Sequence, residues 1–513
     1  MRKTAFTLLA LTILACCLPA LAQGPEPARG LITVGEEISL TLESEGLDRT
    51  ISDQSLLVWH EEISLPGASY IAPHFSYFNL PDGAELIVRS PDGSRSWSFT
   101  GYGKAEALLK DGFWGIHIPG DTAVLELYSS VAVPEGAVIM DRFAHGYPDA
   151  EALIASQPFP DDAGNEAICG SDDSERAQCA QSGHPTIYSK SRAVARLLIN
   201  GTGGCTGWLV GSQGHLVTNN HCIGNSSDAL NTDYEFMAEG SCSTFCESFG
   251  ACPGTVVATS ATFIKTDVGL DYTLVRLPTN PTGTYGYLQM RNSLPNLNER
   301  IYIPGHPGAW GKRISIDSTH SSNPLGYCEI DSLSEPACTG GSVNDIGYFC
   351  DTRGGSSGSP VIATADHCVV SLHHCAYCEN RGTRTPNIIS DLGSSLPSNA
   401  VCPSCTSPPT TPGSIVGPSS LCPGAVGFYS ASASTGADSY RWELVGTSWA
   451  RNTSSPQTSL VPVYPQGYYT LRVRAYNNCG SSSWRTRTIY IKSNSDPTCG
   501  DCLIVPCEEP ISE

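Results

Sequence analysis

The segment at residues 354–361, GGSSGSPV, constrains the fold of this chain more than any other feature. It presents Ser357 in a glycine-rich turn, but a serine hydroxyl is a poor nucleophile at neutral pH. It needs a neighbouring imidazole as base, and the imidazole needs a carboxylate that fixes its tautomer and stabilises its charged form. Two upstream segments supply these groups, His221 in VTNNHC and Asp271 in VGLDYTLVRL. The fold must therefore bring three distant segments to one point.

The glycines of this segment have a physical role of their own. In acyl transfer the carbonyl oxygen becomes an anion, and backbone N–H groups must converge on it. A turn that aims the amides of Gly355 and Ser357 at one point favours residues without a Cβ. We therefore predict an oxyanion hole formed by these two backbone amides.

The order of the three residues along the chain also carries information. It is His, Asp, Ser, whereas the α/β-hydrolases have the order Ser, Asp, His. The histidine, aspartate and serine segments, together with GCTG at residues 204–207, resemble the bacterial trypsin-like serine endopeptidases. Within these the most similar group is the lysyl and glutamyl endopeptidases, and the resemblance covers about residues 166–400.

This resemblance implies a double β-barrel of the chymotrypsin class. It implies that His221 is the general base, that Asp271 orients it and that Ser357 is the nucleophile. It also implies a disulfide between Cys205 and Cys222, which clamps the loop that bears the base. Neither a cofactor nor a metal ion is expected.

Three other aspartates follow His221 and compete for the orienting role, namely Asp228, Asp233 and Asp267. We prefer Asp271 because the strand pattern LVRL follows it at residues 274–277, as in the resembled family. Asp267 is interpreted as a surface residue.

The start of the chain reads as a secretion signal at residues 1–22. Two basic residues precede an apolar run, and Ala-Leu-Ala at residues 20–22 forms a cleavage site. A lipoprotein cleavage box that ends at Cys16 is the alternative. No other stretch is long and apolar enough to predict a membrane span. We therefore expect a secreted, extracellular protein, with a periplasmic or lipid-anchored location as alternatives.

Turn signals and composition divide the rest of the chain. Residues 23–147 have short strand-like runs between turns such as PDG and predict a β-sandwich that resembles the propeptide region of lysyl endopeptidase precursors; a permanent accessory domain is the alternative. Residues 148–167 are a linker, and residues 168–402 are the protease domain. A Pro/Ser/Thr-rich linker at residues 403–412 precedes residues 413–492, which resemble PKD-like and immunoglobulin-like modules, and a tail at residues 493–513. The predicted fold class is all-β.

Cysteine usage agrees with export. Of 22 cysteines, Cys16 and Cys17 lie in the signal, and such a dense set in an exported chain predicts a disulfide framework. In the C-terminal module Cys422 and Cys479, which we assign to disulfides, flank a strand with Trp442, a residue that such sandwiches bury. The pairs CPSC at 402–405 and CGDC at 499–502 have the spacing of a four-thiolate zinc site, which is the less favoured alternative.

The net charge excludes one class of partner. The formal charge is −21, and residues 23–165 hold 22 acidic and seven basic side chains. Nucleic acid is therefore not expected as a partner, because phosphate binding requires the opposite sign. We expect protein or peptide substrates, and by analogy the C-terminal module would bind a surface, a polymer or a partner.

The specificity pocket is less well defined by the sequence. Asp351 stands six residues before Ser357, where a carboxylate in trypsin-like enzymes would pair with Arg or Lys. His373 and His374 favour the opposite preference, because in glutamyl endopeptidases a histidine on this strand contacts the acidic side chain. We predict a weak preference for Arg or Lys, with Glu as the alternative.

One departure from the resembled family concerns latency. In chymotrypsin-like zymogens an aspartate precedes the nucleophile and receives the freed N-terminal ammonium, but Ser356 stands here. Latency would then come from the acidic N-terminal domain covering the cleft.

Two function classes follow from these observations. The first is an active serine endopeptidase; the second is an inactive protease-fold protein that serves in binding or adhesion. Disabled relatives usually lose a triad member, and none is missing in this sequence.

Overall fold

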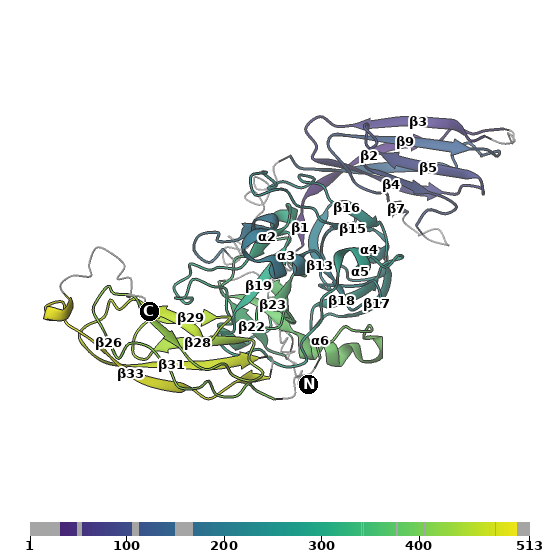
Figure 1. Cartoon of the computed structure of the whole chain (residues 1–513). Coiled ribbons are helices and arrows are strands. Elements are labelled where there is room, and N and C mark those ends of the chain that lie inside the picture. The colour runs from purple at the N-terminus through teal and green to yellow at the C-terminus, as the bar shows by residue number, and fades with distance from the viewer. Residues whose placement is uncertain are drawn as a thin grey trace, which may run out of the picture.

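The computed structural model describes residues 31–48, 54–104, 112–148, 168–339, 341, 343–375, 378–403, 407–477 and 479–499. The expected signal at residues 1–22, nearly all of the linker at 148–167 and most of the tail lie outside the described residues. Figure 1 shows three consecutive parts, which we call the N-terminal unit (residues 31–148), the central region (168–402) and the C-terminal unit (407–499). None of the described helices is both long and apolar enough to cross a membrane.

Two antiparallel sheets build the central region. The first has the order β16 (Thr255–Ala258), β15 (Thr232–Phe236), β12 (Val194–Ile199), β13 (Gly203–Val210), β14 (His215–Thr218), β18 (Tyr272–Arg276) and β17 (Thr262–Asp267). The second has the order β11 (Glu175–Arg176), β20 (Arg313–Ser315), β19 (Ile301–Gly305), β23 (Pro360–Ala363), β24 (Val369–Cys375), β25 (Asn380–Arg384), β22 (Asp345–Tyr348) and β21 (Ser332–Glu335). The all-β prediction is confirmed for this region.

The core of the central region explains its stability. Every residue of β12 and β13 is buried, and most of their apolar side chains, including Trp208, pack in one cluster with Tyr234. Burial of this apolar surface is the main favourable term in folding. The helices are short and peripheral: α2 (Ala180–Gly183), α3 (Pro185–Ser191), α4 (Ser226–Leu230), α5 (Thr282–Tyr285), α6 (Thr385–Leu392), η1 (Ala177–Cys179), η2 (Pro307–Ala309) and η3 (Gly393–Ser395).

The N-terminal unit consists of two sheets around a separate core. One sheet contains β2 (Gly35–Glu43), β10 (Val138–Gly146), β4 (Tyr70–Phe78), β7 (Phe113–Trp114) and β8 (Ile118–Pro119). The other contains β3 (Leu56–Ser64), β9 (Thr122–Ser129), β5 (Ala84–Arg89) and β6 (Ser96–Phe99). Phe75, Phe78, Phe99 and Phe113 pack together between the sheets in edge-on and tilted pairs.

The N-terminal unit is firmly attached to the central region. Its first strand, β1 (Ile32–Thr33), leaves the unit and pairs antiparallel with β13 (Figure 1). Ile32, Val34, Tyr70 and Trp114 then form a shared apolar cluster with residues of the central region such as Leu198. The two parts therefore share both a sheet and a core.

The C-terminal unit has a larger and a smaller sheet. The larger contains β26 (Ser420–Leu421), β33 (Arg485–Ile491), β31 (Gly467–Asn477), β28 (Ser439–Leu444), β29 (Ala450–Thr453) and β32 (Gly480–Ser481). The smaller pairs β27 (Gly427–Ser430) with β30 (Gln457–Leu460), and η4 (Pro497–Cys499) ends the described chain. Trp442 is fully buried in the core of this unit, as the sequence predicted.

Disulfides reinforce the central region and the C-terminal unit. The described residues of the N-terminal unit contain no cysteine. The described bridges are Cys169–Cys378, Cys179–Cys242, Cys205–Cys222, Cys246–Cys252, Cys338–Cys375, Cys368–Cys402 and Cys422–Cys499. Cys479 is also disulfide-bonded. Because Cys402 and Cys499 are both used in disulfides, they do not form the four-thiolate zinc site that their spacing allowed.

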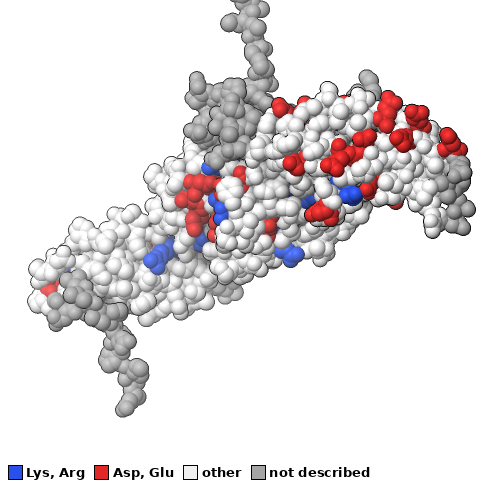
Figure 2. All heavy atoms as spheres, turned by 90° about the horizontal axis from the view of Figure 1, so that it is seen from above, with Lys and Arg blue, Asp and Glu red and all other residues white. Residues whose placement is uncertain are grey.

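The charge asymmetry predicted from the sequence is visible on the surface. Figure 2 shows Asp and Glu side chains spread over the visible face of the N-terminal unit, with few basic side chains among them. An acidic surface of this kind aids solubility and repels polyanions.

Candidate active site

His221 and Asp271 form the centre of the site, close to the end of β14 and the start of β18 in the first sheet. His221 Nδ1 lies 2.7 Å from Asp271 Oδ2, and the backbone N–H of His221 donates to Asp271 Oδ1 at 3.0 Å. Two contacts to one carboxylate fix both the tautomer and the direction of the imidazole ring. Among the described residues, His221 Nε2 makes no hydrogen bond, so this nitrogen remains available to a reactant.

The local structure explains why these two residues meet. His221 follows β14 and Asp271 precedes β18, and these strands pair so that Thr218 faces Thr273. Asp271 has a φ of 48°, a left-handed conformation, and Asn219 donates a hydrogen bond to its carbonyl oxygen at 2.8 Å. Non-glycine residues in this region of φ are uncommon and often belong to functional sites.

The electrostatics of Asp271 favour its ionised form. Burial alone would raise the pKa of this carboxyl group, but the contacts from His221 and His374 hold the pKa well below its usual range. The carboxylate is therefore charged at every pH at which the protein is expected to be folded.

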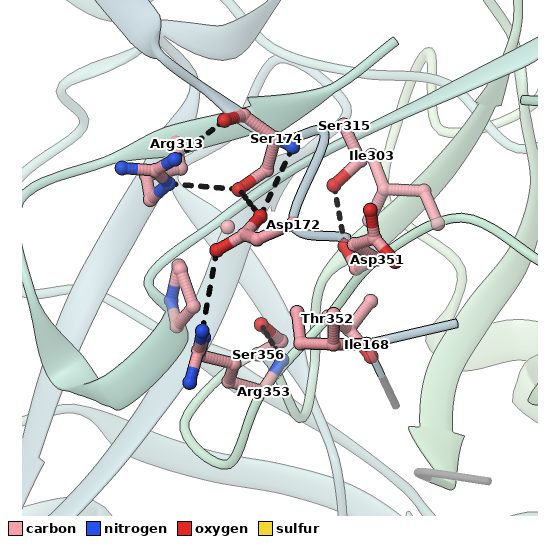
Figure 3. Close-up of a pocket in the computed structure, with 12 residues that line it drawn as sticks. Ile168, Asp172, Ser174, Ile303, Arg313, Ser315, Asp351, Thr352, Arg353 and Ser356 are labelled. Carbon is pink, nitrogen blue, oxygen red and sulfur yellow. Dashed lines mark hydrogen bonds and ion pairs between the residues drawn. The ribbon is translucent and has the colours of Figure 1, made fainter. Parts of the chain in front are cut away.

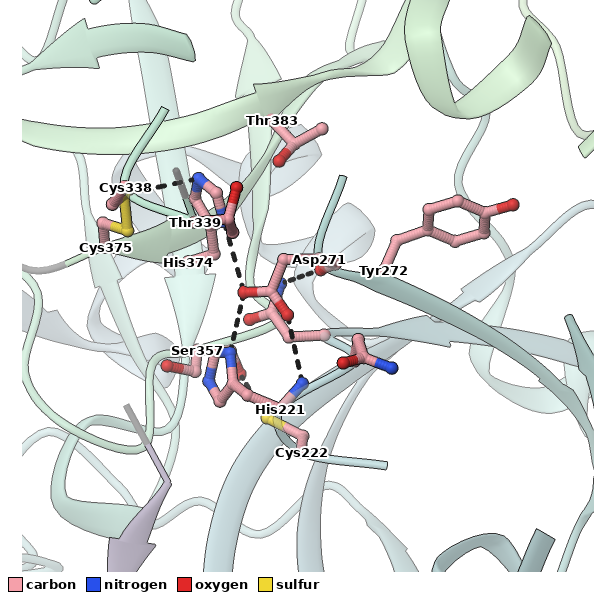
Figure 4. A network of polar contacts seen from close by, with 12 residues as sticks. His221, Cys222, Asp271, Tyr272, Cys338, Thr339, Ser357, His374, Cys375 and Thr383 are labelled. Atoms are coloured by element: carbon pink, nitrogen blue, oxygen red, sulfur yellow. Dashed lines mark hydrogen bonds and ion pairs between the residues drawn. A yellow bond between two sulfur atoms is a disulfide. The ribbon is translucent and has the colours of Figure 1, made fainter. Parts of the chain in front are cut away.

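Ser357 comes from a loop of the second sheet and lies close to His221 (Figure 4). It lies in the loop between β22 and β23, and its carbonyl oxygen accepts from Thr206 N–H of β13 at 2.9 Å. The same oxygen lies 4.0 Å from the sulfur of Cys222, the residue after His221. Figure 4 shows Ser357 beside the imidazole of His221, with Asp271 on the other side of the ring.

Two glycines shape the loop around Ser357. Gly355 has a φ of 90° and Gly358 a φ of 89°, values that favour glycine. A Cβ at Gly355 would lie 2.8 Å from the carbonyl oxygen of His306, and one at Gly358 would lie 2.0 Å from the carbonyl oxygen of Thr206. At Gly355 and Gly358 the structure thus agrees with the expectation that this turn favours residues without a Cβ.

The expected disulfide between Cys205 and Cys222 is present. It joins β13 to the residue directly after His221. The cross-link therefore fixes the base-bearing loop to the strand that also holds the carbonyl oxygen of Ser357.

Comparisons with known proteins agree with this geometry. The trypsin-like peptidase domain family matches residues 205–372, and the PKD-like domain family matches residues 408–489. The secreted RxLR effector protein 73 of Plasmopara viticola is 38% identical over 343 residues, which span 65% of this chain and 82% of that protein. The chain belongs to the same protein family as this relative.

Two further similarities concern the peptidase domain. The glutamyl endopeptidase of Bacillus licheniformis is 25% identical over 240 residues, or 44% of this chain and 67% of that enzyme. A solved structure of a Glu endopeptidase in complex with MPD aligns with a TM-score of 0.32 and 17% identity, covering 44% of this chain and 98% of that chain. The central region is a trypsin-like peptidase domain with an all-β fold, and a PKD-like domain follows it.

In this peptidase domain the carboxylate of Asp351 is engaged by the backbone, and its place in the specificity pocket stays a prediction. Its carboxylate accepts hydrogen bonds from the backbone N–H groups of Cys169 at 2.9 Å and Asp173 at 2.8 Å. Figure 3 shows Asp351 in a small pocket whose other walls include Asp172 and Arg353. Burial, with smaller contributions from Asp172 and Asp173, raises the pKa of Asp351 to about 6. Asp351 therefore anchors the start of the peptidase domain.

The two histidines predicted for the pocket are separated. His373 is buried, its Nδ1 lies 2.8 Å from the hydroxyl of Tyr348, and the backbone of Arg381 bonds its ring as well. Burial lowers the pKa of His373 to about 3, so it is neutral. The role of these two histidines in the specificity pocket stays a prediction.

His374 occupies a position that the sequence did not reveal. It lies behind the catalytic pair, with Nδ1 3.2 Å from Asp271 Oδ2 and Nε2 3.0 Å from Asp345 Oδ2 (Figure 4). The strand pattern of residues 369–375 could have indicated that His373 and His374 point to opposite faces of β24, because side chains alternate along a strand. No sequence signal identified Asp345.

Two groups of described side chains have the composition of metal ligands, Cys205 with His221 and Cys222, and Cys338 with His374 and Cys375. In each group the two cysteines are joined to each other by a disulfide, so neither cysteine can bind a metal ion as a thiolate.

Proposed function

We propose that this protein is a secreted serine endopeptidase that hydrolyses peptide bonds through an acyl-enzyme. Ser357 is the nucleophile, His221 the general base and Asp271 the residue that orients the base. The observation that carries the proposal is the double contact between Asp271 and His221, with an unpartnered Nε2 turned to the side where Ser357 lies.

The reaction follows from this arrangement. Ser357 Oγ attacks the peptide carbonyl carbon while His221 Nε2 takes the hydroxyl proton. The amides of Gly355 and Ser357 stabilise the oxyanion, and the imidazolium then returns the proton to the leaving amine. Water attacks the acyl-enzyme with His221 again as base, which releases the carboxylic acid and restores the serine.

The residue preference at the cleaved bond is best interpreted as acidic. The basic preference depended on the Asp351 carboxylate, which is already engaged by two backbone amides. The acidic alternative is supported by the similarity to a glutamyl endopeptidase. Peptides that differ only in Glu, Gln, Lys or Ala before the cleaved bond test it, and a higher kcat/KM for Lys than for Glu would contradict it.

Secretion is supported by the predicted signal at residues 1–22, by the disulfides and by a relative whose name describes it as secreted. The flanking units are proposed to be β-sandwich domains, and the C-terminal one is proposed to bind a surface, polymer or partner.

The central experiment separates an active enzyme from an inactive binding protein. The wild type, Ser357→Ala and His221→Ala are tested for peptide hydrolysis and for labelling by a fluorophosphonate probe. Turnover should fall by several orders of magnitude in both variants, roughly 10⁴-fold or more. Ser357→Ala should also abolish labelling by the probe. Ser322→Ala, at an exposed serine of the same domain, is the matched control. Wild-type turnover by the Ser357→Ala protein would exclude the proposed nucleophile.

A further inference from the structure

His374 lies between two carboxylates that come from different sheets. Its strand, β24, and the strand of Asp345, β22, belong to the second sheet, whereas Asp271 precedes β18 of the first sheet. The ring contacts Asp271 Oδ2 through Nδ1 at 3.2 Å and Asp345 Oδ2 through Nε2 at 3.0 Å. A chain of four groups thus runs from Asp345 through His374 and Asp271 to His221.

The geometry defines the protonation state of His374. A carboxylate only accepts hydrogen bonds, so each ring nitrogen must carry a proton to donate to the oxygen that it faces. The ring is therefore an imidazolium in a buried position between two negative charges. The other groups near it are His373, which precedes it in β24, the disulfide Cys338–Cys375, whose Cys338 sulfur lies 3.6 Å from Nε2, and His221 beyond Asp271.

Asp271 is held by three donors. The N–H of His221 fixes Oδ1, and Oδ2 is shared between the rings of His221 and His374. Without His374 the carboxylate would lose one of these constraints and would have a buried charge with fewer partners. With all three contacts, the Asp271 carboxylate keeps the His221 imidazole in the orientation that proton transfer needs.

We propose that His374, itself held by Asp345, is a positioning residue that orients Asp271 and balances its charge, so that His221 remains an efficient base. This inference rests on the proposed function. It also predicts an alkaline limit to activity, because the imidazolium must stay protonated, and the two carboxylates raise the pKa of His374 to about 9 even though burial alone would lower it.

The test uses His374→Gln and Asp345→Asn in the full chain, with kcat and KM measured from pH 5 to 10. A lost hydrogen bond between charged groups should lower kcat about 10- to 100-fold, with KM nearly unchanged. In Asp345→Asn the alkaline limit should move to lower pH, because one carboxylate no longer stabilises the imidazolium. Thermal unfolding of each variant checks that the fold persists.

The outcomes separate this inference from the proposed function. If Ser357→Ala is inactive but both variants keep the wild-type kcat and alkaline limit, His374 has no positioning role. If Ser357→Ala remains active, the proposed function itself is wrong. A retained kcat in His374→Gln at a shifted KM would indicate a role in substrate binding and would also overturn the inference.

A second and independent observation concerns β1. This strand of the N-terminal unit pairs with β13 in the register Ile32 to Gly204 and Thr33 to Gly203, and Val34 N–H donates to the carbonyl oxygen of Thr202 at 2.8 Å. Gly204 is two residues from Thr206, which bonds the backbone of Ser357. β1 therefore pairs with the part of β13 that directly precedes the contact with the candidate nucleophile.

The register defines the direction of β1 relative to Ser357. Ile32 faces Gly204, nearer to Thr206, and Thr33 faces Gly203, farther from it, so the chain runs away from the serine in the N- to C-terminal direction. Extended peptides bind proteins by adding a strand to a sheet edge. A substrate strand in this position would consist of the residues that follow the cleaved bond.

The fit of β1 in this position is close. Ile32 and Val34 are buried in the cluster shared with Tyr70 and Trp114. A Cβ at Gly204 would lie 3.0 Å from the side chain of Ile32, so the glycine leaves room for it. The N-terminal unit thus holds β1 against β13 through side chains as well as backbone.

We infer that β1 occupies the part of the substrate groove that receives residues after the cleaved bond, so that the attached N-terminal unit excludes extended substrates. This inference also rests on the proposed function. It gives a structural basis to the latency that the sequence assigned to the N-terminal domain.

Two substrates test the competition. One carries only a chromogenic amine after the cleaved bond, and the other carries four residues there. Ile32→Asp should release β1 and raise kcat/KM for the longer substrate by about tenfold or more, while the chromogenic substrate changes little. Thr33→Ala, at an exposed side chain of the same strand, is the control. An equal effect on both substrates, or no effect, would overturn the inference.

A second measurement does not depend on a destabilising variant. Hydrogen exchange of residues 31–34 is followed in the Ser357→Ala protein with and without the longer peptide at saturating concentration. Faster exchange with the peptide supports displacement of β1, whereas unchanged exchange in the peptide-bound protein contradicts it.

Discussion

Arg95 of the N-terminal unit and Glu235 of the peptidase domain form an ion pair across their buried interface, with Nη2 2.5 Å from Oε1. The other oxygen of Glu235 accepts from Arg196, whose Nη2 lies at 2.6 Å and whose Nε lies at 2.9 Å. His117 of the N-terminal unit contacts the neighbouring Asp233 at 2.8 Å. The interface therefore depends on one carboxylate that forms ion pairs with two guanidinium groups, in addition to the apolar contacts.

Glu235→Ala should destabilise the protein by about 3–5 kcal/mol, because it leaves Arg95 and Arg196 charged and buried without their partner. Chemical denaturation of the full chain measures the change. Glu45→Ala, at an exposed glutamate of the N-terminal unit, is the control and should stay within about 0.5 kcal/mol of the wild type. A loss of similar size in both proteins would contradict the assigned role.

Gly358→Ala should abolish activity and lower stability. The added Cβ would lie 2.0 Å from the carbonyl oxygen of Thr206, at a φ of 89° that alanine avoids. The loop would have to move and would displace Ser357 from His221. Gly326→Ala, also at a positive φ but with open space around it, is the control for the cost of the backbone conformation alone. Peptide hydrolysis and thermal unfolding distinguish the two variants.

Asp351→Ala should act on stability and leave the residue preference unchanged. It removes the acceptor of two backbone N–H groups, those of Cys169 and Asp173, and each unsatisfied buried donor costs about 1–3 kcal/mol. The ratio of kcat/KM for Glu and Lys peptides should equal that of the wild type. A fall confined to the Lys peptide would restore Asp351 to the specificity pocket.

The stabilising contribution of three largely buried carboxyl groups should fall as pH rises from about 4 to 7. Burial raises the pKa of Glu329 to about 7 and the pKa of Asp331 and Asp351 to about 6, all above the ordinary values of 4.5 for Glu and 3.8 for Asp. At these three positions the folded state binds more protons than the unfolded state in this range, so each group favours folding at the acidic end. The melting temperature of the wild type relative to Glu329→Gln should therefore be higher at pH 5 than at pH 7.5. An equal difference between the two proteins at both pH values would exclude Glu329 as a contributor.

Removal of the Cys205–Cys222 disulfide should cost about 3 kcal/mol, since its loop spans 17 residues. The double variant Cys205→Ala, Cys222→Ala should also lose activity at temperatures where it remains folded, because the His221 loop is released from β13. Activity per folded molecule, measured by active-site titration at 10 °C, checks this second effect.

Much of the candidate site could be predicted from the sequence because its signals are local. The glycines around Ser357, the segment that bears His221 and the strand after Asp271 each encode a turn or a strand in a few residues. The bridge between Cys205 and Cys222 was expected from the resemblance to the endopeptidase family, and the structure contains it. The burial of Trp442 also followed from a short pattern of strand residues.

The pocket residues could not be placed from the sequence because their role depends on which groups surround each side chain. Asp351 stands at the spacing of a pocket carboxylate, but its oxygens accept from the backbone of Cys169 and Asp173, which lie 182 and 178 residues away along the chain. His373 and His374 are neighbours in sequence, yet the alternation of side chains along β24 sends one toward Tyr348 and the other toward Asp271 and Asp345.

The sequence by itself determined which side chains can carry out acyl transfer and in which order they occur, because residue type and local turn chemistry are written in short segments. Only the tertiary structure decided which hydrogen-bond donors each carboxylate contacts and which strand pairs next to the Ser357 loop. Asp345 behind His374, and β1 on the edge of β13, are contacts between segments distant in the chain. They arise from how the sheets pack and pair, and no local pattern encodes that arrangement.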